Sequence, residues 1–368
     1  MESMHDRYMQ EALTLARQGL GRTSPNPAVG AVLVNGDQVV GRGFHVWSQK
    51  DHAEIVALQQ AGNLARGATL YVTLEPCSHT GRTAPCVDAI IAAGVSRVVA
   101  AMKDPNPMVS GSGITKLKEA GIEALIHQQY TSEAEQLNEP FLHSMSTGKP
   151  LVTLKSALTL DGKIAAPEDN SGWITSAKAR EHVQQLRHLT DCILTGIGTV
   201  LADDCLLTDR SGGERSRPLL RIVVDSQLRI PLESKMVLSA TNDLIVACTS
   251  AASPDRRKAL ERSGVEVVAL DGSDGRTNLQ ELVTLLASRH YRSLMVEAGS
   301  KVNWAFLEQN IADKIFFYYA PKILGGTQSL PVAGGVGRRR RADAIRMDRL
   351  QLHAITSQEF AVEAWVLK

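Results

Sequence analysis

Apolar residues in the first third of the chain switch repeatedly between helical and strand spacing. Residues 5–18 place apolar side chains on one helical face. Short apolar runs at 31–34 and 38–44 flank an Asn-Gly-Asp turn, which predicts a β-hairpin. Further strands are expected at 69–74, 97–102 and 122–126, and helices at 51–61, 86–93 and 114–120. This alternation predicts an α/β layer with a partly parallel sheet.

A second alternation of the same kind follows residue 150. A helix is expected at 131–145, after which the segment Ser146-Thr147-Gly148-Lys149-Pro150 interrupts the pattern. We therefore expect two domains, residues 1–147 and residues 148–368. In the second, strands are expected at 151–158, 192–195, 219–225, 243–249, 265–270, 293–296 and 314–319. Helices are expected at 177–188, 254–263, 279–288 and 302–309, so the second domain is also α/β.

Length and composition agree with two globular domains. The chain has 368 residues, of which 43% are hydrophobic and 21% charged. Its net charge of +1 gives no general attraction to nucleic acid or membranes. We expect no transmembrane helix and no secretory signal, because the required apolar stretches are absent. An odd number of scattered cysteines argues against a disulfide framework and for a cytoplasmic protein.

A candidate zinc site lies in the first domain. His52-Ala53-Glu54 opens one predicted helix, and Pro76-Cys77 precedes Cys86 at the start of another. One imidazole and two thiolates form a three-ligand set whose fourth position is open to water, as in catalytic zinc sites. Zinc lowers the pKa of its water to about 7, and Glu54 can move that water's proton. This His-x-Glu and Pro-Cys pattern is the signature of zinc deaminases.

The alternatives to catalysis are two unrelated cysteines with a surface histidine, or a structural zinc site. Such a site requires a fourth protein ligand, and His79 is the candidate near the others in sequence. A non-catalytic scaffold has no need of Glu54, which is not required to hold the metal. We therefore predict Zn²⁺, one per deaminase domain, held by His52, Cys77 and Cys86, with Glu54 as the catalytic acid and base.

The eight residues between the two cysteines narrow this interpretation further. Other nucleoside and nucleic-acid deaminases have two residues there. The run from Glu75 to Cys86 resembles the deaminase domain of the bifunctional riboflavin biosynthesis deaminase–reductase family. So do Pro25-Asn26-Pro27-Ala28-Val29-Gly30, Gly43-Phe44-His45 and Asp104-Pro105-Asn106-Pro107. Ala84 is a small departure, since that family commonly has proline there.

The resemblance implies a cytidine-deaminase-like three-layer fold and a phosphorylated pyrimidine as substrate. The ring 2-amino group of a diaminopyrimidinone bearing a ribosylamino 5′-phosphate is hydrolysed to a carbonyl, with release of ammonia. Asn26 is expected at the pyrimidine edge, because an amide both donates and accepts. His45, His79 and Arg82 are further expected substrate contacts, the last two towards the phosphate. The alternatives are a turn residue at Asn26 and a solvated charge at Arg82.

The second domain contains no GxGxxG motif that opens a helix after a strand, so a Rossmann fold is not supported. Glycines follow two predicted strands at 196–198 and at 299, where backbone amides can approach an anion. Read in order, five segments are similar to the reductase domain of the same family. They are 154–164, Gly172-Trp173-Ile174-Thr175-Ser176, 198–204, Val224-Asp225-Ser226 and Val296-Glu297-Ala298-Gly299, the last of which commonly reads Glu-Gly-Gly.

This second resemblance implies a dihydrofolate-reductase-like fold and NADPH-dependent reduction of the ribosyl group to ribityl. The expected cofactor contacts are Ala157, Trp173, Thr199, Asp203, Ser226, Gly299, Ser300, Lys301, Val302, Asn303, Trp304 and Ala305. The expected substrate contacts are Ser171, Arg187, Leu207, Arg210 and Glu297, and Lys155 is expected to protonate or orient the sugar. The alternatives are solvated charges at Arg187 and Arg210, and a core or capping aromatic at Trp173.

Two other functions compete with this interpretation, and one is a non-catalytic, zinc-stabilised scaffold whose second domain merely binds nucleotide, which the presence of Glu54 disfavours. A nucleoside or nucleic-acid deaminase with an accessory nucleotide-binding domain is disfavoured by the long inter-cysteine loop and the neutral charge. The four consecutive arginines at 338–341 have no aromatic residues interleaved, so we expect a solvated loop rather than a nucleic-acid surface. We expect a small-molecule substrate and no nucleic-acid or membrane partner. The sequence leaves a homo-oligomer open.

Overall fold

The chain divides into two units in a computed structural model that describes residues 4–80, 84–106, 110–168 and 171–368. Unit 1 comprises Met1–Gly148 and the short segment Glu214–Arg217. Unit 2 comprises Lys149–Gly213 and Pro218–Lys368. Gly148, at φ +70°, ends the last helix of unit 1, where a left-handed conformation favours glycine.

Unit 1 contains a mixed five-stranded sheet in the order β2-β1-β3-β4-β5. Its strands are β1 (Gly30–Asn35), β2 (Gln38–Phe44), β3 (Thr69–Val72), β4 (Arg97–Ala100) and β5 (Glu123–Ile126). The hairpin β1–β2 is antiparallel, and β3, β4 and β5 run parallel. The partly parallel α/β layer expected from the sequence is therefore confirmed.

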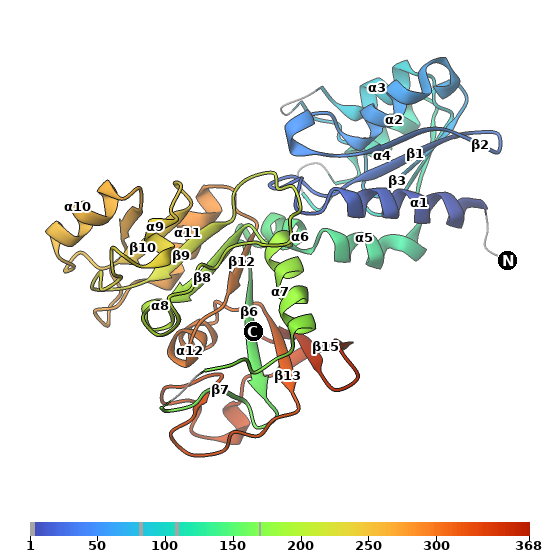
Figure 1. Ribbon diagram of the computed structural model, residues 1–368. Coiled ribbons are helices and arrows are strands. Elements are labelled where there is room, and N and C mark those ends of the chain that lie inside the picture. The colour runs from blue at the N-terminus through green and yellow to red at the C-terminus, as the bar shows by residue number, and fades with distance from the viewer. Residues whose placement is uncertain (1–3, 81–83, 107–109, 169–170) are drawn as a thin grey trace. The chain divides into compact units, whose positions relative to one another are not determined.

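Helices lie on both faces of this sheet. They are α1 (Met4–Gln18), α2 (Ala53–Ala61), α3 (Cys86–Ala92), α4 (Ser112–Glu119), α5 (Thr131–Leu137) and α6 (Glu139–Thr147), with short 3-10 turns at Trp47–Gln49, Gly62–Ala65 and Gln128–Tyr130. α1 contacts α5 on one face, whereas α2, α3 and α4 contact one another in sequence on the other (Figure 1). Buried aliphatic side chains of the sheet and helices form one continuous core.

The single helix expected at 131–145 is wrong, because the structure has two helices there. Asn138 separates α5 from α6, and Pro140 lies in the first turn of α6, where its missing N–H costs nothing. The Asn138 side chain accepts a hydrogen bond from the backbone N–H of Ala28 at 2.7 Å and donates to the Ala28 carbonyl at 3.0 Å. This polar anchor holds the loop that contains Asn26.

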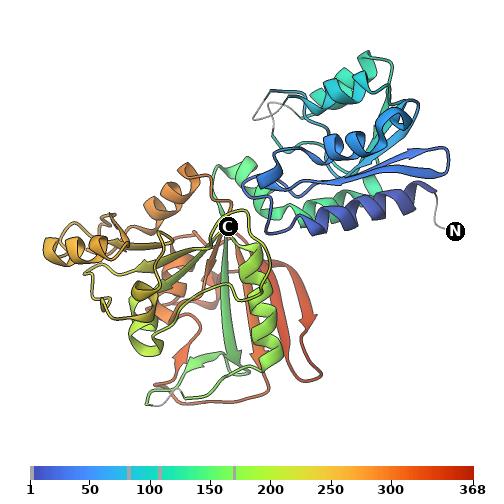
Figure 2. The ribbon, with the colours of Figure 1, turned by 45° about the horizontal axis from the view of Figure 1, so that its top comes forward.

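Unit 2 is built on a nine-stranded sheet in the order β11-β10-β9-β8-β12-β6-β13-β16-β15. Its strands are β6 (Leu151–Thr159), β8 (Cys192–Gly196), β9 (Leu220–Val224), β10 (Leu244–Cys248), β11 (Glu266–Ala269), β12 (Ser293–Val296), β13 (Lys314–Ala320), β15 (Met347–Ala354) and β16 (Phe360–Val366). The strands from β11 to β13 are parallel, and β16 and β15 are antiparallel additions. Figure 2 shows these last two strands, in red, at one edge.

Helices also cover both faces of the second sheet. They are α7 (Ala177–Leu189), α8 (Ile197–Asp203), α9 (Lys235–Leu238), α10 (Pro254–Arg262), α11 (Leu279–Ser288) and α12 (Ser300–Glu308). Side chains of α11 and α12 pack in one hydrophobic cluster, and those of α8, α9 and α10 pack in another. Neighbouring residues of β8, such as Ile193 and Leu194, belong to different clusters, as expected for a strand buried on both faces.

Several short or peripheral elements of unit 2 were not predicted from the sequence. These are α8, α9, β15, β16, the small antiparallel pair β7 (Lys163–Ala165) and β14 (Leu330–Pro331), and a 3-10 turn at Arg341–Asp343. Most side chains of β15 are exposed, so this edge strand lacks the buried apolar run that identifies the central strands. Both units are nevertheless α/β, as the sequence predicts.

Candidate active sites

Two helix N-termini and one loop bring the three predicted metal ligands together. His52 caps the N-terminus of α2, Cys86 is the first residue of α3, and Cys77 lies in the loop after β3. Gly43 of β2 allows α2 to lie directly on the sheet, because a Cβ there would lie 2.1 Å from the Ala53 carbonyl oxygen. The close packing of α2 fixes where its first turn begins.

The geometry of these donors fits a zinc ion. The His52 Nδ1 atom lies 3.2 Å from the Cys86 Sγ and 3.6 Å from the Cys77 Sγ. Tetrahedral zinc with Zn–S of ~2.3 Å and Zn–N of ~2.0 Å separates its ligand atoms by about 3.5 Å. Across the described part of the chain, these residues form the one group of three or more suitable donors, and His79 is not in it. The donor set is therefore of the three-ligand type, which leaves a coordination position open.

The two thiols are electrostatically coupled. The hydrogen bond from Cys86 is the strongest of the influences that lower the pKa of Cys77 to about 4. The same hydrogen bond, together with burial, raises the pKa of Cys86. The hydrogen bond with Cys77 also raises the pKa of His52, against the opposing effect of burial. A divalent cation binds cysteines as thiolates, so its binding here would displace the thiol protons of the pair.

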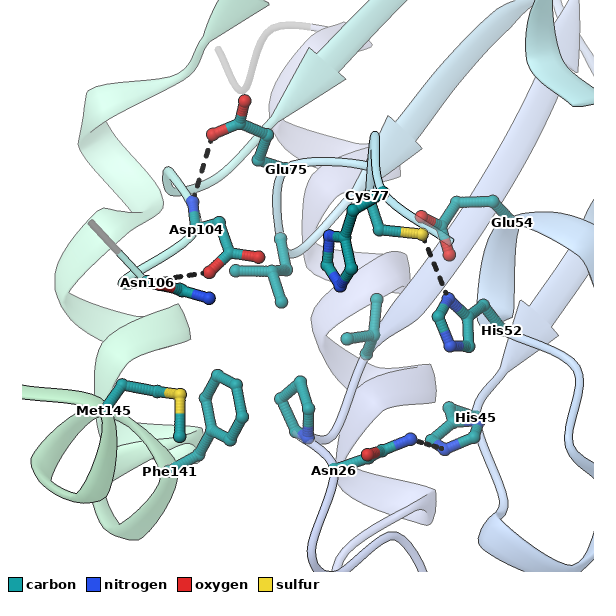
Figure 3. A pocket seen from close by; sticks show the side chains of 14 residues that line it. Asn26, His45, His52, Glu54, Glu75, Cys77, Asp104, Asn106, Phe141 and Met145 are labelled. Carbon is teal, nitrogen blue, oxygen red and sulfur yellow. Dashed lines mark hydrogen bonds between the residues drawn. The ribbon is translucent and has the colours of Figure 1, made fainter. Parts of the chain in front are cut away.

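Glu54 lies beside this group in a pocket of ≈ 260 Å³ (Figure 3). Its side chain is buried, and burial raises the pKa of its carboxyl, while the charge of His52 opposes this. The walls include the predicted residues Asn26, His45 and His79. Arg82, predicted to meet the phosphate, lies outside the described residues. A buried carboxyl next to a metal-type donor set is suited to proton transfer at neutral pH.

The hydrogen bonds of His45 determine which way the Asn26 amide faces. His45 Nδ1 lies 2.8 Å from the carbonyl oxygen of Asp51, so this nitrogen carries the proton and donates. The other ring nitrogen therefore accepts from Asn26 Nδ2 at 3.1 Å. The Asn26 carbonyl oxygen is left as an acceptor on the pocket side (Figure 3).

The pocket lining also includes residues that were not predicted from the sequence, among them Glu75, Asp104, Asn106, Phe141 and Met145. Asp104 and Asn106 belong to a motif that supported the family resemblance, so a signal was present in the sequence. Burial raises the pKa of the Asp104 carboxyl. Phe141 and Met145 lie on α6, and nothing in their spacing separates them from core residues of an ordinary helix.

In unit 2, three predicted residues from distant segments meet in a buried ionic group. Glu297 accepts hydrogen bonds from Lys155 Nζ at 3.1 Å and from Arg187 Nε and Nη2 at 2.8 and 2.9 Å. The register that pairs Val296 of β12 with Leu154 of β6 makes Glu297 and Lys155 neighbours. Burial alone raises the pKa of Glu297, but the charges of Lys155 and Arg187 outweigh it and lower the pKa to about 2.

Arg187 is engaged in this group before it meets any substrate. Besides its two bonds to Glu297, it donates from Nη1 to the Thr208 carbonyl oxygen at 3.0 Å. Its side chain is buried, so the alternative of a solvated charge is wrong for Arg187. Arg210, in contrast, is exposed, and its backbone N–H donates to Gln184.

The predicted cofactor residues around α12 include polar atoms without partners. Gly299 caps the helix, and Ser300 Oγ and Asn303 Oδ1 are buried without a hydrogen bond in the described structure. A Cβ at Gly299 would lie 3.9 Å from Thr199 Oγ1, so the start of α12 lies beside α8. Strands β8 and β12 are parallel neighbours whose carboxyl ends precede these two helices. The backbone N–H groups at this helix N-terminus and the Ser300 hydroxyl are donors that fit the phosphates of a dinucleotide.

Other predicted cofactor residues lie further along the sheet. Ser226 follows β9, two strands from β12, and its Oγ lies 3.1 Å from Thr277 Oγ1. Asp203 ends α8, and burial raises the pKa of its carboxyl. Ala157 lies on β6 two residues after Lys155. An extended ligand is needed to reach all of these positions.

Three further predicted residues of unit 2 differ from one another in exposure. Trp173 is 69% exposed, with the Arg180 guanidinium 4.6 Å from its ring centroid, so the core alternative for this residue is wrong. Leu207 is buried in the hydrophobic core and has a backbone φ of +50°. Ser171 is exposed and borders residues outside the described range.

The arginine run at 338–341 is exposed, as the solvated-loop interpretation expects. Arg340 pairs with Asp343, and the Arg338 guanidinium lies 5.6 Å from the Trp304 ring centroid. All five cysteines are free of disulfides. Among the described helices, none has both the length and the apolar character needed to cross a membrane.

Two protein families match consecutive parts of the chain. The cytidine and deoxycytidylate deaminase zinc-binding region matches residues 2–102, and the RibD C-terminal domain matches residues 150–360. The chain is 43% identical to the riboflavin biosynthesis protein RibD of Bacillus amyloliquefaciens, over 96% of this chain and 94% of that one. It is 42% identical to the protein of the same name from Escherichia coli, over 92% and 93% of the two chains.

Solved structures give the same result. The chain is similar to RibD of Acinetobacter baumannii, with a TM-score of 0.88, 36% identity and 99% of each chain covered. It is also similar to a diaminohydroxyphosphoribosylaminopyrimidine deaminase/5-amino-6-(5-phosphoribosylamino)uracil reductase of Thermotoga maritima. That match has a TM-score of 0.83 and 35% identity over 99% of each chain.

Proposed function

Because this chain belongs to the RibD family and is a bifunctional deaminase and reductase of riboflavin biosynthesis, we propose that unit 1 performs the deamination and unit 2 the reduction. The observation that carries the proposal is the His52, Cys77 and Cys86 group with buried Glu54 in one pocket. The protein uses zinc and NADPH. The proposed first substrate is 2,5-diamino-6-ribosylamino-4(3H)-pyrimidinone 5′-phosphate.

In unit 1, we assign proton transfer to Glu54. Zinc, when bound by His52, Cys77 and Cys86, acts as a Lewis acid that makes water acidic enough to attack at neutral pH. Glu54 takes a proton from the attacking water and delivers it to the departing ring amine, so that ammonia leaves. Asn26 orients the pyrimidine by accepting a hydrogen bond at its carbonyl oxygen, while His45 holds the amide in place.

In unit 2, we assign the sugar to the ionic group and the cofactor to the helix N-terminus. NADPH, when bound, supplies the hydride that reduces C1′ of the ribosyl group. The Ser300 hydroxyl donates to its phosphates beside the backbone amides at the start of α12, and the Asn303 carbonyl oxygen can only accept a hydrogen bond. Lys155, held by Glu297, donates or orients the proton that the opened sugar oxygen requires.

We also propose that the protein acts in a reducing compartment such as the cytoplasm, without nucleic-acid partners. The five free cysteines support the first point, because disulfides are rare where thiols are kept reduced. The net charge of +1 supports the second, because nucleic-acid binding is dominated by the phosphate backbone. The enzyme acts on a small molecule.

Incubation of the purified chain with the proposed substrate, zinc and NADPH tests the whole assignment. Ammonia release and NADPH oxidation are followed separately in the same reaction. We expect ammonia without NADPH, and NADPH oxidation with the deaminated intermediate as the sole substrate. If the intermediate elicits no NADPH oxidation, the role proposed for unit 2 is wrong, whatever the outcome for unit 1.

A further inference from the structure

Glu75 is a buried carboxylate beside the metal ligands that none of the roles above employs. It is 3% exposed, lines the deaminase pocket and lies two residues before Cys77. We propose that Glu75 is a positioning residue, which fixes the pocket wall at Asp104 and Asn106 relative to Cys77 and thereby sets the affinity for the pyrimidine. This inference rests on the deaminase function proposed for unit 1.

The first support is the set of hydrogen bonds that Glu75 accepts. Its Oε2 accepts the backbone N–H of Asp104 at 3.1 Å and of Gly111 at 2.9 Å, and its Oε1 accepts that of Ile114 at 3.1 Å. A carboxylate offers about four acceptor sites, so most are taken by the backbone. Glu75 is therefore engaged with the chain rather than available as a proton acceptor for substrate.

The wall that Glu75 holds faces the pocket. Figure 3 shows the Glu75 carboxylate reaching the Asp104 backbone, while the Asp104 side chain turns towards the pocket interior. Asp104 in turn accepts the backbone N–H of Asn106 at 2.8 Å, which sets the direction of the following residue. A shift of the Asp104 backbone thus moves two polar side chains of the pocket together.

A second group of contacts ties the same segments together from the other side of Cys77. The hydroxyl oxygens of Ser78 and Ser112 lie 2.6 Å apart, and Lys116 Nζ donates to the Ser78 carbonyl oxygen at 2.8 Å. A Cβ at Gly113 would lie 2.1 Å from the Pro76 carbonyl oxygen. The first turn of α4 therefore packs directly against the residues around the metal ligand, with no room for a side chain.

These contacts make Glu75 the link between metal ligand and pocket wall. Residues 75–78 carry Cys77, and the segment that begins at Asp104 carries the polar wall. Hydrogen bonds from backbone N–H groups to a buried carboxylate are stronger than those to a neutral acceptor. Loss of the Glu75 carboxylate therefore loosens both segments. Because Glu75 is not in the ligand group, we expect the effect in substrate affinity rather than in zinc content.

The Glu75→Gln variant of the full chain tests this directly. The amide replaces one acceptor oxygen by a donor, which then opposes a backbone N–H. We expect KM for ammonia release to rise about tenfold or more, which corresponds to ~1.4 kcal/mol. We expect kcat to change less than KM, zinc to remain at one per chain, and NADPH oxidation with the deaminated intermediate to keep its normal rate.

Glu75→Asp provides a milder variant in case the amide impairs folding. It keeps the negative charge but retracts the oxygens by one methylene, so a role in positioning predicts a raised KM here too. Asn35→Ala is the matched control, because it removes side-chain hydrogen bonds of 2.9 and 3.2 Å to the backbone of Leu64 and Arg66, away from the pocket lining. We expect the control to keep its KM.

The outcomes separate this inference from the function on which it rests. If the unchanged chain releases no ammonia from the pyrimidine, the deaminase function fails. If the unchanged chain is active and both Glu75 variants keep its KM, the positioning role is wrong. Loss of zinc with a fall in kcat at constant KM also overturns it, because Glu75 would then act on the metal group.

Discussion

The two units differ in how their sites are assembled. In unit 1, the reactive groups come from short segments whose residue types already indicate metal chemistry, namely His52, Cys77 and Cys86 with Glu54. In unit 2, Lys155, Arg187 and Glu297 come from β6, α7 and the end of β12, and only the fold joins them into one ionic group. Metal sites draw on few side-chain types at characteristic spacings, whereas ion pairs draw on the commonest charged residues.

The two sites also differ in the interactions that hold their residues together. The spacing of the unit 1 donors fits a divalent cation. The unit 2 group is complete without a metal, because Lys155 and Arg187 neutralise the carboxylate of Glu297. We therefore expect the two activities to respond independently to metal removal, to substitution and to acid.

Removal of zinc should have the largest effect. Dialysis against a chelator should abolish ammonia release, because water without a Lewis acid has a pKa near 16 rather than about 7. NADPH oxidation with the deaminated intermediate should continue at its original rate. Measuring both activities and the zinc content before and after dialysis checks this, and parallel loss of both activities would show that the sites are not independent.

Substitution of Glu297 should affect mainly the reductase. Glu297→Gln leaves the charges of Lys155 and Arg187 buried without a counter-ion, which costs about 3–5 kcal/mol of unfolding free energy. We expect kcat/KM for NADPH oxidation to fall by roughly 100-fold or more, since the proton donor loses its orientation. Ammonia release should persist. Urea unfolding and steady-state kinetics measure the two effects.

Glu266→Gln is a matched control for this substitution. Glu266 lies in the same unit and accepts a hydrogen bond from Arg289 at 2.8 Å, but both side chains are substantially exposed. An exposed pair contributes about 0–1 kcal/mol, so the control should keep its stability and its reductase activity. If Glu266→Gln lowers the unfolding free energy and the reductase activity as much as Glu297→Gln does, burial of the ion pair is not the cause of the effect.

Acid should have a smaller, graded effect on unit 2. The charges of Lys155 and Arg187 outweigh burial and hold the pKa of Glu297 at about 2, below its ordinary value of 4.5. The stabilisation that this provides is present above pH 4.5 and is lost as the pH falls towards 2. The lost contribution is about 3 kcal/mol. Urea unfolding at several acidic pH values should show the unfolding free energy falling with pH in this range. The Glu297→Gln variant should lack this fall.

Much of the fold could be predicted from the sequence, because the central strands are continuous apolar runs bounded by turn residues. β8 and β12 are examples, since both are buried on two faces. The edge strand β15 was missed because its side chains are mostly exposed and form no continuous apolar run. The break at Asn138 was missed because the apolar spacing continues across it, and only Pro140 marks it.

The candidate sites could be predicted to a different extent in each unit. The proposed metal ligands His52, Cys77 and Cys86 follow from residue type and spacing alone. The placement of Glu75 against the backbone of Asp104, Gly111 and Ile114 could not be predicted, because those amides carry no side-chain signal. Likewise, the sequence does not show that Arg187 is committed to Glu297, since a charged residue on a helix is equally compatible with solvent exposure.

The Glu54→Gln variant, assayed for both activities in the full chain, tests the central claim of two independent sites most directly. The amide keeps the shape of Glu54 but cannot carry a proton between water and amine. Ammonia release should fall by about 10²–10⁴-fold, the range of general acid–base catalysis, while zinc content and NADPH oxidation with the deaminated intermediate stay unchanged. Ammonia release at the normal rate would contradict the account.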